Sequence, residues 1–270
     1  MVNYENRVVL FLDILGFKNI IDKTYNPTTD EDIPTSISEL YEVLLSMTED
    51  FAIDKKKTSK IVTQFSDSIV ISFKEDEKEG IFILFEEIQN LIIKLLSKRI
   101  ICRGAISYGK LIHNRNIIFG PALVDAYETE TKAAMYPRVI LDKSIVDIGK
   151  TYRSYKGKEF DEETANNILE YLTTENLSKD TDDKYYIDYF LAVVRKTNDF
   201  ELIKSHIENL KFIILNGLKH KRPDLKVKYG WMKNKYNTMV DYFKKMGIAD
   251  LKIVTNRELN NYLRKLNNLN

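Results

Sequence analysis

Hydrophobic residues in the first half of the chain follow strand-like and helix-like spacings in turn. Residues 8–12 form an uninterrupted apolar run that ends at Asp13, which is typical of a buried central strand. Residues 36–51 carry apolar side chains at helical spacing. Residues 60–73 instead alternate, with Asp67 between two strand-like runs. The sequence therefore predicts a strand, then helices, then a hairpin that turns at Asp67.

The same succession of elements continues as far as residue 141. Residues 79–98 predict a strongly amphipathic helix, and residues 100–119 predict a second hairpin that turns near Gly109. Pro121 opens another helix, because proline is tolerated in the first helical turn. A strand over residues 138–141 follows. This order is that of a ferredoxin-like antiparallel palm with added elements, so the predicted fold class is α+β.

The chain changes character near residue 150. We divide it into a palm over residues 1–150 and a C-terminal region over residues 151–270, which is expected to pack on the palm or on a partner subunit. The C-terminal region is predicted to be mainly helical, with a helix, a strand and two long helices over residues 162–172, 185–194, 200–219 and 227–246. The asparagine-rich end of the chain is predicted to fray.

Composition narrows the classes of partner. Lys and Arg number 41 against 40 Asp and Glu, without the basic excess of a general nucleic-acid binder. The one cysteine excludes an intrachain disulfide and fits a reducing compartment. We find no signal-peptide pattern and no uninterrupted apolar stretch that could cross a bilayer. We therefore expect a cytoplasmic protein that neither binds nucleic acid nor inserts directly into a membrane.

Two aspartates stand at strand ends, where they could meet at one edge of an antiparallel palm. The carboxylates of Asp13 and Asp67, with the backbone carbonyl of Ile14, would form the hard oxygen site that Mg²⁺ or Mn²⁺ prefers. Gly16 and the N–H groups of the turn that includes Phe17 are candidates for binding the phosphates. Taken singly, each aspartate also fits an ordinary helix cap or turn residue.

Four segments, in order, resemble the motifs of the class III nucleotidyl cyclases. They are residues 11–17 (FLDILGF), 65–70 (FSDSIV), 103–109 (RGAISYG) and 119–127 (FGPALVDAY). The resemblance covers about residues 7–142. It implies a homodimer with sites between the subunits and two Mg²⁺ or Mn²⁺ ions per site. It also implies catalytic roles for Asp13 and Asp67 in the in-line attack of a 3′-hydroxyl on a nucleoside triphosphate.

Four positions depart from the adenylate cyclases of that class. Thr63 stands where a lysine is usual, and Ile117 stands where an aspartate or threonine reads adenine. Val124 and Glu128 replace the ribose asparagine and the transition-state arginine. Purine recognition of the usual kind is therefore not expected.

The chain is more similar to the short pyrimidine cyclases of Pycsar antiphage systems, which make cyclic UMP or cyclic CMP for an effector protein. That similarity is carried by residues 12–18, 102–107, 136–139, 229–231 and 236–237. We predict a uridylate cyclase in preference to a cytidylate cyclase. An adenylate cyclase with atypical base contacts and a non-catalytic, nucleotide-binding cyclase homologue are the alternatives.

Two residues are candidates for recognising the base. Arg103 can donate to the O2 or O4 carbonyl of a pyrimidine, although an ion-paired strand residue is the alternative. Thr63 is the second candidate, against an ordinary outward-facing strand threonine. Arg138 is predicted to pair with Glu130 in preference to contacting a phosphate.

Overall fold

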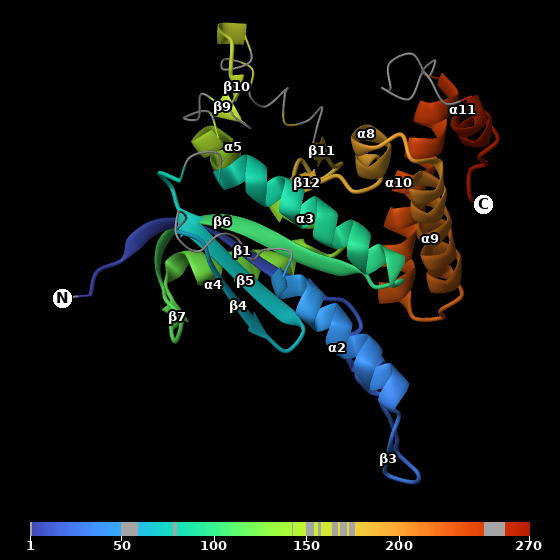
Figure 1. The fold of residues 1–270 in the computed structure, drawn as a ribbon, viewed down its shortest axis with the longest axis horizontal. Helices are drawn as coiled ribbons and strands as arrows, with labels where there is room; N and C mark the ends of the chain where they lie inside the picture. The colour runs from blue at the N-terminus through green and yellow to red at the C-terminus, as the bar shows by residue number, and fades with distance from the viewer. Residues whose placement is uncertain are drawn as a thin grey trace.

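The computed structural model describes residues 2–49, 59–77, 80–141, 143–149, 154–155, 158–163, 167, 172, 176–245 and 257–270. It is an α+β fold with a mixed sheet, as predicted (Figure 1). The order of strands across the sheet is β11-β12-β8-β6-β1-β5-β4, and β7 pairs with β6 off this path. In chain order these are β1 (Glu5–Ile14), β4 (Ile61–Phe65), β5 (Ser68–Lys74), β6 (Cys102–His113), β7 (Ile118–Phe119), β8 (Val139–Leu141), β11 (Leu177–Lys179) and β12 (Tyr185–Ile187).

The centre of the sheet has the ferredoxin-like arrangement. Strands β4, β5, β1 and β6 lie side by side and every neighbouring pair is antiparallel. The prediction of an antiparallel palm holds for these four strands but not for the next one, because β8 pairs parallel to β6. Strands β12 and β11, from the C-terminal region, then extend the same sheet through antiparallel pairs.

Helices and two small hairpins complete the fold. The helices are α1 (Phe17–Ile21), α2 (Pro34–Glu49), α3 (Gly80–Ser97), α4 (Pro121–Ala133), α5 (Lys143–Gly149), α8 (Ala192–Lys196), α9 (Phe200–Leu218), α10 (Pro223–Lys245) and α11 (Arg257–Arg264). The hairpins pair β2 (Tyr25–Asn26) with β3 (Glu31–Asp32), and β9 (Ser154–Tyr155) with β10 (Lys158–Glu159). In Figure 1, α3 runs across the sheet towards α9 and α10, which stand at its end.

Both faces of β1 are covered, which accounts for its unbroken apolar run. Successive side chains of a strand point to opposite faces. Val8 and Leu10 lie in the main core with the buried residues of α3, whereas Val9 packs with Ala122 and Ala126 of α4 in a smaller cluster. The α4 face is the one on which Asp13 lies, at the end of the same strand.

The second predicted hairpin turns later than expected. Strand β6 passes through Gly109, which pairs with Arg7 of β1, so the prediction of a turn there is wrong. The chain reverses instead after His113, where the side chain of Asn114 accepts hydrogen bonds from the N–H groups of Asn116 and Ile117 at 2.9 and 3.0 Å. Glycine inside a strand more often marks a bend than a turn, and asparagine supplies the turn here.

The C-terminal region is mainly helical, as predicted. Helices α9 and α10 confirm the two long helices, although α10 begins four residues earlier, at Pro223. The strand predicted over residues 185–194 is wrong beyond Ile187, because the Asp188 carboxylate accepts the N–H of Phe190 at 2.9 Å and turns the chain into α8. Most of the helix predicted over residues 162–172 lies outside the described residues.

The end of the chain is held against α10, so the prediction that it frays is wrong. The side-chain amide of Asn237 accepts the N–H of Leu269 at 2.7 Å and donates to its carbonyl at 3.0 Å. The Leu269 side chain is buried. Within the part of the chain that the structure describes, no helix is both long and apolar enough to traverse a bilayer.

Candidate functional site

The two predicted metal-binding aspartates come together at one end of the central strands. Cross-strand pairing places Asp13 of β1 between Ser68 of β5 and Arg103 of β6. The Ser68 hydroxyl donates to the Asp13 carboxylate at 3.1 Å. Asp67 directly precedes Ser68, and its carbonyl accepts the N–H of Ile14 at 3.2 Å. Asp67 is therefore tied to the strand that carries Asp13.

Local sequence fixes the position of Asp67. Phe65 pairs with Ser68, so Ser66 and Asp67 form a two-residue hairpin turn. Ser66 has a φ of 55°, and tight hairpin turns require such left-handed backbone. The predicted hairpin is confirmed, and its turn directs Asp67 to the edge of the sheet beyond Asp13.

The electrostatics of the pair suit a bound cation. Burial, followed by the negative charge of Asp67, raises the pKa of Asp13 to about 6, against the opposing effect of the Ser68 hydrogen bond. A divalent cation between the two carboxylates would remove that repulsion. The described residues include no group of three or more His, Cys, Asp or Glu side chains able to hold a metal. Two carboxylates are hard oxygen ligands of the kind that Mg²⁺ and Mn²⁺ prefer, and metal binding by Asp13, Asp67 and the Ile14 carbonyl stays a prediction.

A short helix follows the strand, as predicted, but it begins at Phe17 and not at Ile14, because β1 extends through Ile14. The N–H groups of Ile14 and Leu15, predicted to be free for phosphates, donate instead to the carbonyls of Asp67 and Ile101 at 3.2 and 2.9 Å. Gly16 has a φ of 78°, a left-handed conformation in which any side chain would be strained, and α1 begins at Phe17. Gly16 therefore provides the sharp turn between Asp13 and α1. Contact of Gly16 and Phe17 with a nucleotide stays a prediction.

Arg103 forms an ion pair beside the aspartates. Its Nε atom contacts Oε1 of Glu130, from α4, and the two side chains are 22% and 3% exposed. The positive charge of Arg103 also lowers the pKa of Asp13, against the larger effect of burial, which places the guanidinium near the carboxylates. Arg103 thus lies beside Asp13 and is ion-paired, as the structural alternative predicted, whereas its contact with a base stays a prediction.

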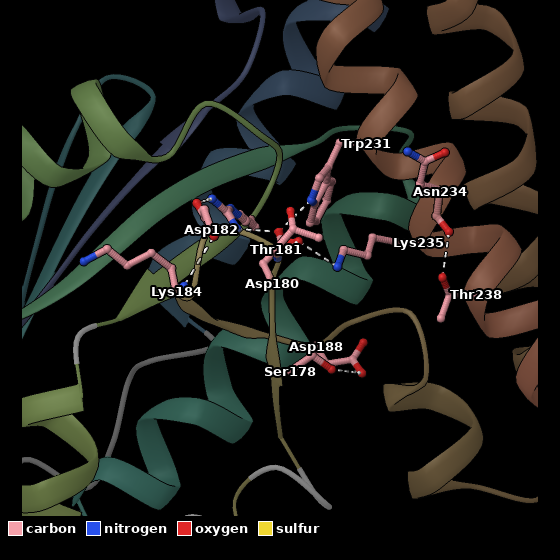
Figure 2. A network of polar contacts seen from close by, with 11 residues as sticks. Ser178, Asp180, Thr181, Asp182, Lys184, Asp188, Trp231, Asn234, Lys235 and Thr238 are labelled. Atoms are coloured by element: carbon pink, nitrogen blue, oxygen red, sulfur yellow. Dashed lines mark hydrogen bonds and ion pairs between the residues drawn. The ribbon is translucent and has the colours of Figure 1, made fainter.

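Arg138 has a different partner from the one predicted. Glu130 is taken by Arg103, and Arg138 instead pairs with Asp180 and Asp182, in the turn between β11 and β12. Figure 2 shows Asp180 facing α10, where it accepts from Trp231 Nε1 at 2.7 Å and pairs with Lys235 at 2.8 Å. The prediction of an Arg138–Glu130 pair is therefore wrong, because the partner comes from the C-terminal region. Arg138 connects the palm to α10.

Thr63 belongs to a chain of buried polar side chains. Its hydroxyl lies 2.9 Å from Nε2 of His113, whose Nδ1 lies 2.8 Å from the Ser72 hydroxyl. Ser72 also accepts from Arg7 Nε at 2.9 Å, and the tautomer of His113 sets the direction of its hydrogen bonds to Ser72 and Thr63. Burial lowers the pKa of His113 to about 4, which keeps the ring neutral. This geometry gives the Thr63 hydroxyl a structural partner.

The sequence analysis did not assign Glu130 to the site. Ala122, Ala126 and Glu130 are the buried residues of α4, spaced four residues apart on one helix face. A glutamate in line with two alanines on the buried face indicates a carboxylate that needs an internal partner. Glu128, by contrast, is exposed and pairs with Lys132 at 2.7 Å.

Apolar side chains are exposed around the site. Phe65, next to the turn that carries Asp67, is 81% exposed. On α4, Val124 and Tyr127 are 54% and 53% exposed, and Tyr127 contacts the ring of Phe11 edge-to-face. Large apolar side chains this exposed on one face are typical of a surface that a partner covers.

No family model matches this sequence, and no curated protein matches it either. Solved structures with similar folds include the adenylyl cyclase CyaB from P. aeruginosa, at 14% identity and a TM-score of 0.40, over 55% of this chain and 82% of that one. A bacterial light-regulated adenylyl cyclase matches at 13% identity and a TM-score of 0.40, over 76% and 100% of the two chains. The catalytic core of a rhodopsin-guanylyl cyclase with converted specificity, in complex with ATPαS, matches at 12% identity and a TM-score of 0.37, over 69% and 96%.

Proposed function

We propose that this chain is a pyrimidine nucleotide cyclase. It would convert UTP, or CTP, to the 3′,5′-cyclic monophosphate and pyrophosphate. The observation that carries the proposal is the placement of Asp13 and Asp67 beside each other at the end of the sheet, with Arg103 in register across from Asp13. The two carboxylates can bind the metal ions that accompany a triphosphate, and the neighbouring Arg103 can bind a polar base. The arrangement therefore suits a nucleoside triphosphate as substrate.

Asp13, Asp67 and the Ile14 carbonyl would hold two Mg²⁺ or Mn²⁺ ions. When bound, the ions supply the charge that activates the 3′-hydroxyl and neutralises the leaving pyrophosphate. The 3′-oxygen would form a bond to the α-phosphorus while the bond from that phosphorus to the bridging oxygen of the β-phosphate breaks, so pyrophosphate leaves and the 3′-hydroxyl proton passes to water. Gly16 and Phe17 would approach the phosphates. Ser68, through its hydrogen bond, orients the Asp13 carboxylate.

Arg103 is the residue proposed to read the base. With Nε paired to Glu130, its terminal amino groups are available to donate to a base carbonyl. Uracil presents two carbonyls and cytosine presents one, so an arginine donor favours UTP. Thr63 is the weaker candidate, since its hydroxyl already forms a hydrogen bond with His113. By resemblance to the Pycsar cyclases, the cyclic nucleotide would activate an effector protein in antiphage defence.

The active form is proposed to be a homodimer. Phe65, Val124 and Tyr127 offer an exposed apolar surface on the side of the sheet that carries Asp13 and Asp67. A second copy that covers this surface would bury those side chains and close the site from bulk water. That environment strengthens every charge interaction within it.

The test is a product assay. The purified protein is incubated separately with ATP, GTP, CTP and UTP, each with Mn²⁺, and the products are identified by mass spectrometry. We expect the product to be cyclic UMP or cyclic CMP. Asp13→Asn and Asp67→Asn should each lower activity at least roughly 1,000-fold, which is the loss typical of removing an essential catalytic group. Asp76→Asn, an exposed aspartate in the loop after β5, is the matched control and should retain activity.

The alternatives give different products. A cyclic purine would support the adenylate cyclase with atypical base contacts and would remove Arg103 from pyrimidine recognition. Nucleotide binding without any cyclic product would support the non-catalytic homologue. Normal activity in either Asp13→Asn or Asp67→Asn would overturn the metal assignment.

A further inference from the structure

The ion pair between Arg103 and Glu130 joins two elements at the edge of the site. Arg103 comes from β6 and Glu130 from the last turns of α4. The Glu130 side chain is almost completely buried, and a buried carboxylate is costly unless a cation compensates it. Burial raises the pKa of Glu130, and the charge of Arg103 opposes that shift. The charged form of the Glu130 carboxylate therefore depends on Arg103 keeping its position beside it.

The backbone around Arg103 is fixed. The N–H of the next residue, Gly104, donates to the Arg138 carbonyl at 3.1 Å. A Cβ added at Gly104 would lie 2.6 Å from the Phe11 carbonyl oxygen, so the two strands approach more closely than any side chain would allow. The start of the Arg103 side chain is therefore held rigidly, and only its distant guanidinium group retains freedom of movement.

Glu130 removes that freedom. Its Oε1 contacts Arg103 Nε, while its Oε2 accepts from the Thr131 hydroxyl at 3.1 Å. Oε2 is hydrogen-bonded, whereas Oε1 and Arg103 Nε are buried and meet as an ion pair without a hydrogen bond among the described residues, so one hydrogen bond and one charge contact orient the carboxylate. Pairing at Nε occupies the inner edge of the guanidinium and leaves the N–H groups on the two Nη atoms for another acceptor.

A second cation gives Glu130 a further effect. Burial and the charge of Arg103 hold the pKa of Lys228, from α10, below its usual range. Like charges repel each other, and the negative charge of Glu130 opposes this effect on Lys228.

We propose that Glu130 is a positioning residue for substrate choice: it holds the Arg103 guanidinium so that its Nη groups face the pyrimidine base. This inference rests on the proposed function, because it assumes that Arg103 reads the base. Glu130 acts through its ion pair with Arg103, and its negative charge also raises the pKa of Asp13.

Steady-state kinetics with UTP and CTP test this role in Glu130→Gln, which keeps the size of the side chain and removes its charge. We expect KM for UTP to rise about tenfold and the preference for UTP over CTP to fall by a similar factor, since both depend on one oriented donor. Glu201→Gln is the matched control, because Glu201 is an exposed glutamate in the first turn of α9 and the site includes no residue of that helix.

A double-mutant cycle separates positioning from mere stabilisation of the fold. If Glu130 acts through Arg103, Glu130→Ala should change KM for UTP by less than twofold in a chain that already carries Arg103→Ala. A full tenfold loss in that background, or an unchanged KM and preference in Glu130→Gln, would overturn the proposal. Circular dichroism and thermal unfolding verify that each variant is folded.

Titration with α,β-methylene-UTP, in which the bridge that must break is blocked, measures binding without turnover. We expect about tenfold weaker binding in Glu130→Gln than in the wild type. If the wild type binds this analogue but forms no cyclic product from UTP or CTP, the proposed function fails. The effect of Glu130 on nucleotide binding is still measured in that case. Equal affinity in the two proteins overturns the positioning role whatever the activity. A wild type that binds no triphosphate overturns both.

Discussion

His206 shows at the residue scale how burial turns a common side chain into a pH-dependent contribution to stability. The ring lies within the helical part of the core, where its Nε2–H donates to the Tyr189 carbonyl at 2.9 Å. Nδ1 is buried without a hydrogen-bond partner among the described residues. Burial lowers the pKa of His206 to about 4, so the folded protein keeps the neutral ring.

The sign of the pH effect follows from that pKa. An unfolded histidine titrates near 6.5, so between pH 6.5 and pH 4 the unfolded state binds the proton that the folded state refuses. The contribution of His206 is complete above pH 6.5 and is lost as the pH falls. Between pH 7.5 and pH 5 we expect a loss of about 2 kcal/mol in the free energy of unfolding from this residue.

Urea unfolding at those two pH values, in the wild type and in His206→Gln, measures the effect. Glutamine can still donate to the Tyr189 carbonyl but does not titrate, so the variant should lose less stability on acidification. His113 is present in both proteins and its contribution cancels in the comparison. Equal losses in the two proteins would show that His206 does not carry this pH dependence.

At the scale of elements, the sequence correctly predicted the strands and helices that depend on short-range patterns of residues. The apolar run before Asp13, the alternation around Asp67 and the helical spacings all depend on neighbours within a few residues, and the structure has those elements. The pairing of Asp13 with Arg103 was not visible, because register between β1 and β6 is set by the whole sheet. The partner predicted for Arg138, Glu130, was wrong for the same reason, because the actual partner, Asp180, lies far along the chain.

The Arg138 cluster predicts unequal effects of two neighbouring aspartates. Asp180 and Asp182 both pair with Arg138, but their side chains are 2% and 43% exposed. Removing one partner of a buried pair leaves an uncompensated charge, whereas an exposed partner contributes little. We expect Asp180→Ala to lower the free energy of unfolding by about 3 kcal/mol, and Asp182→Ala by less than about 1 kcal/mol.

Denaturant unfolding of the two variants compares them directly. Asp182→Ala is the matched control, because it removes the same chemical group from the same turn. Similar losses in both would show that burial does not decide the strength of these pairs. A small loss in Asp180→Ala would mean that water replaces its carboxylate, and that the connection between the palm and α10 is weaker than its geometry indicates.

At the scale of the molecule, the two sides of the central strands have different surroundings. One face is sealed by α3 and the main core, while the face that carries Asp13 is covered by α4 and a small apolar cluster. Exposed apolar side chains continue outward from that cluster. A homodimer that uses this face would bury them, so substitutions there should act on assembly and on activity together.

We expect Val124→Glu with Tyr127→Glu to shift the protein from dimer to monomer in sedimentation velocity, because charge placed in an apolar interface must be desolvated. Activity with UTP should fall at least about tenfold, since each site would lose the surface that closes it. Leu202→Glu is the control: this leucine, on α9, is 58% exposed but lies outside the α4 face. A monomeric wild type with full activity would show that one palm suffices, and the exposed face of α4 would then need another partner.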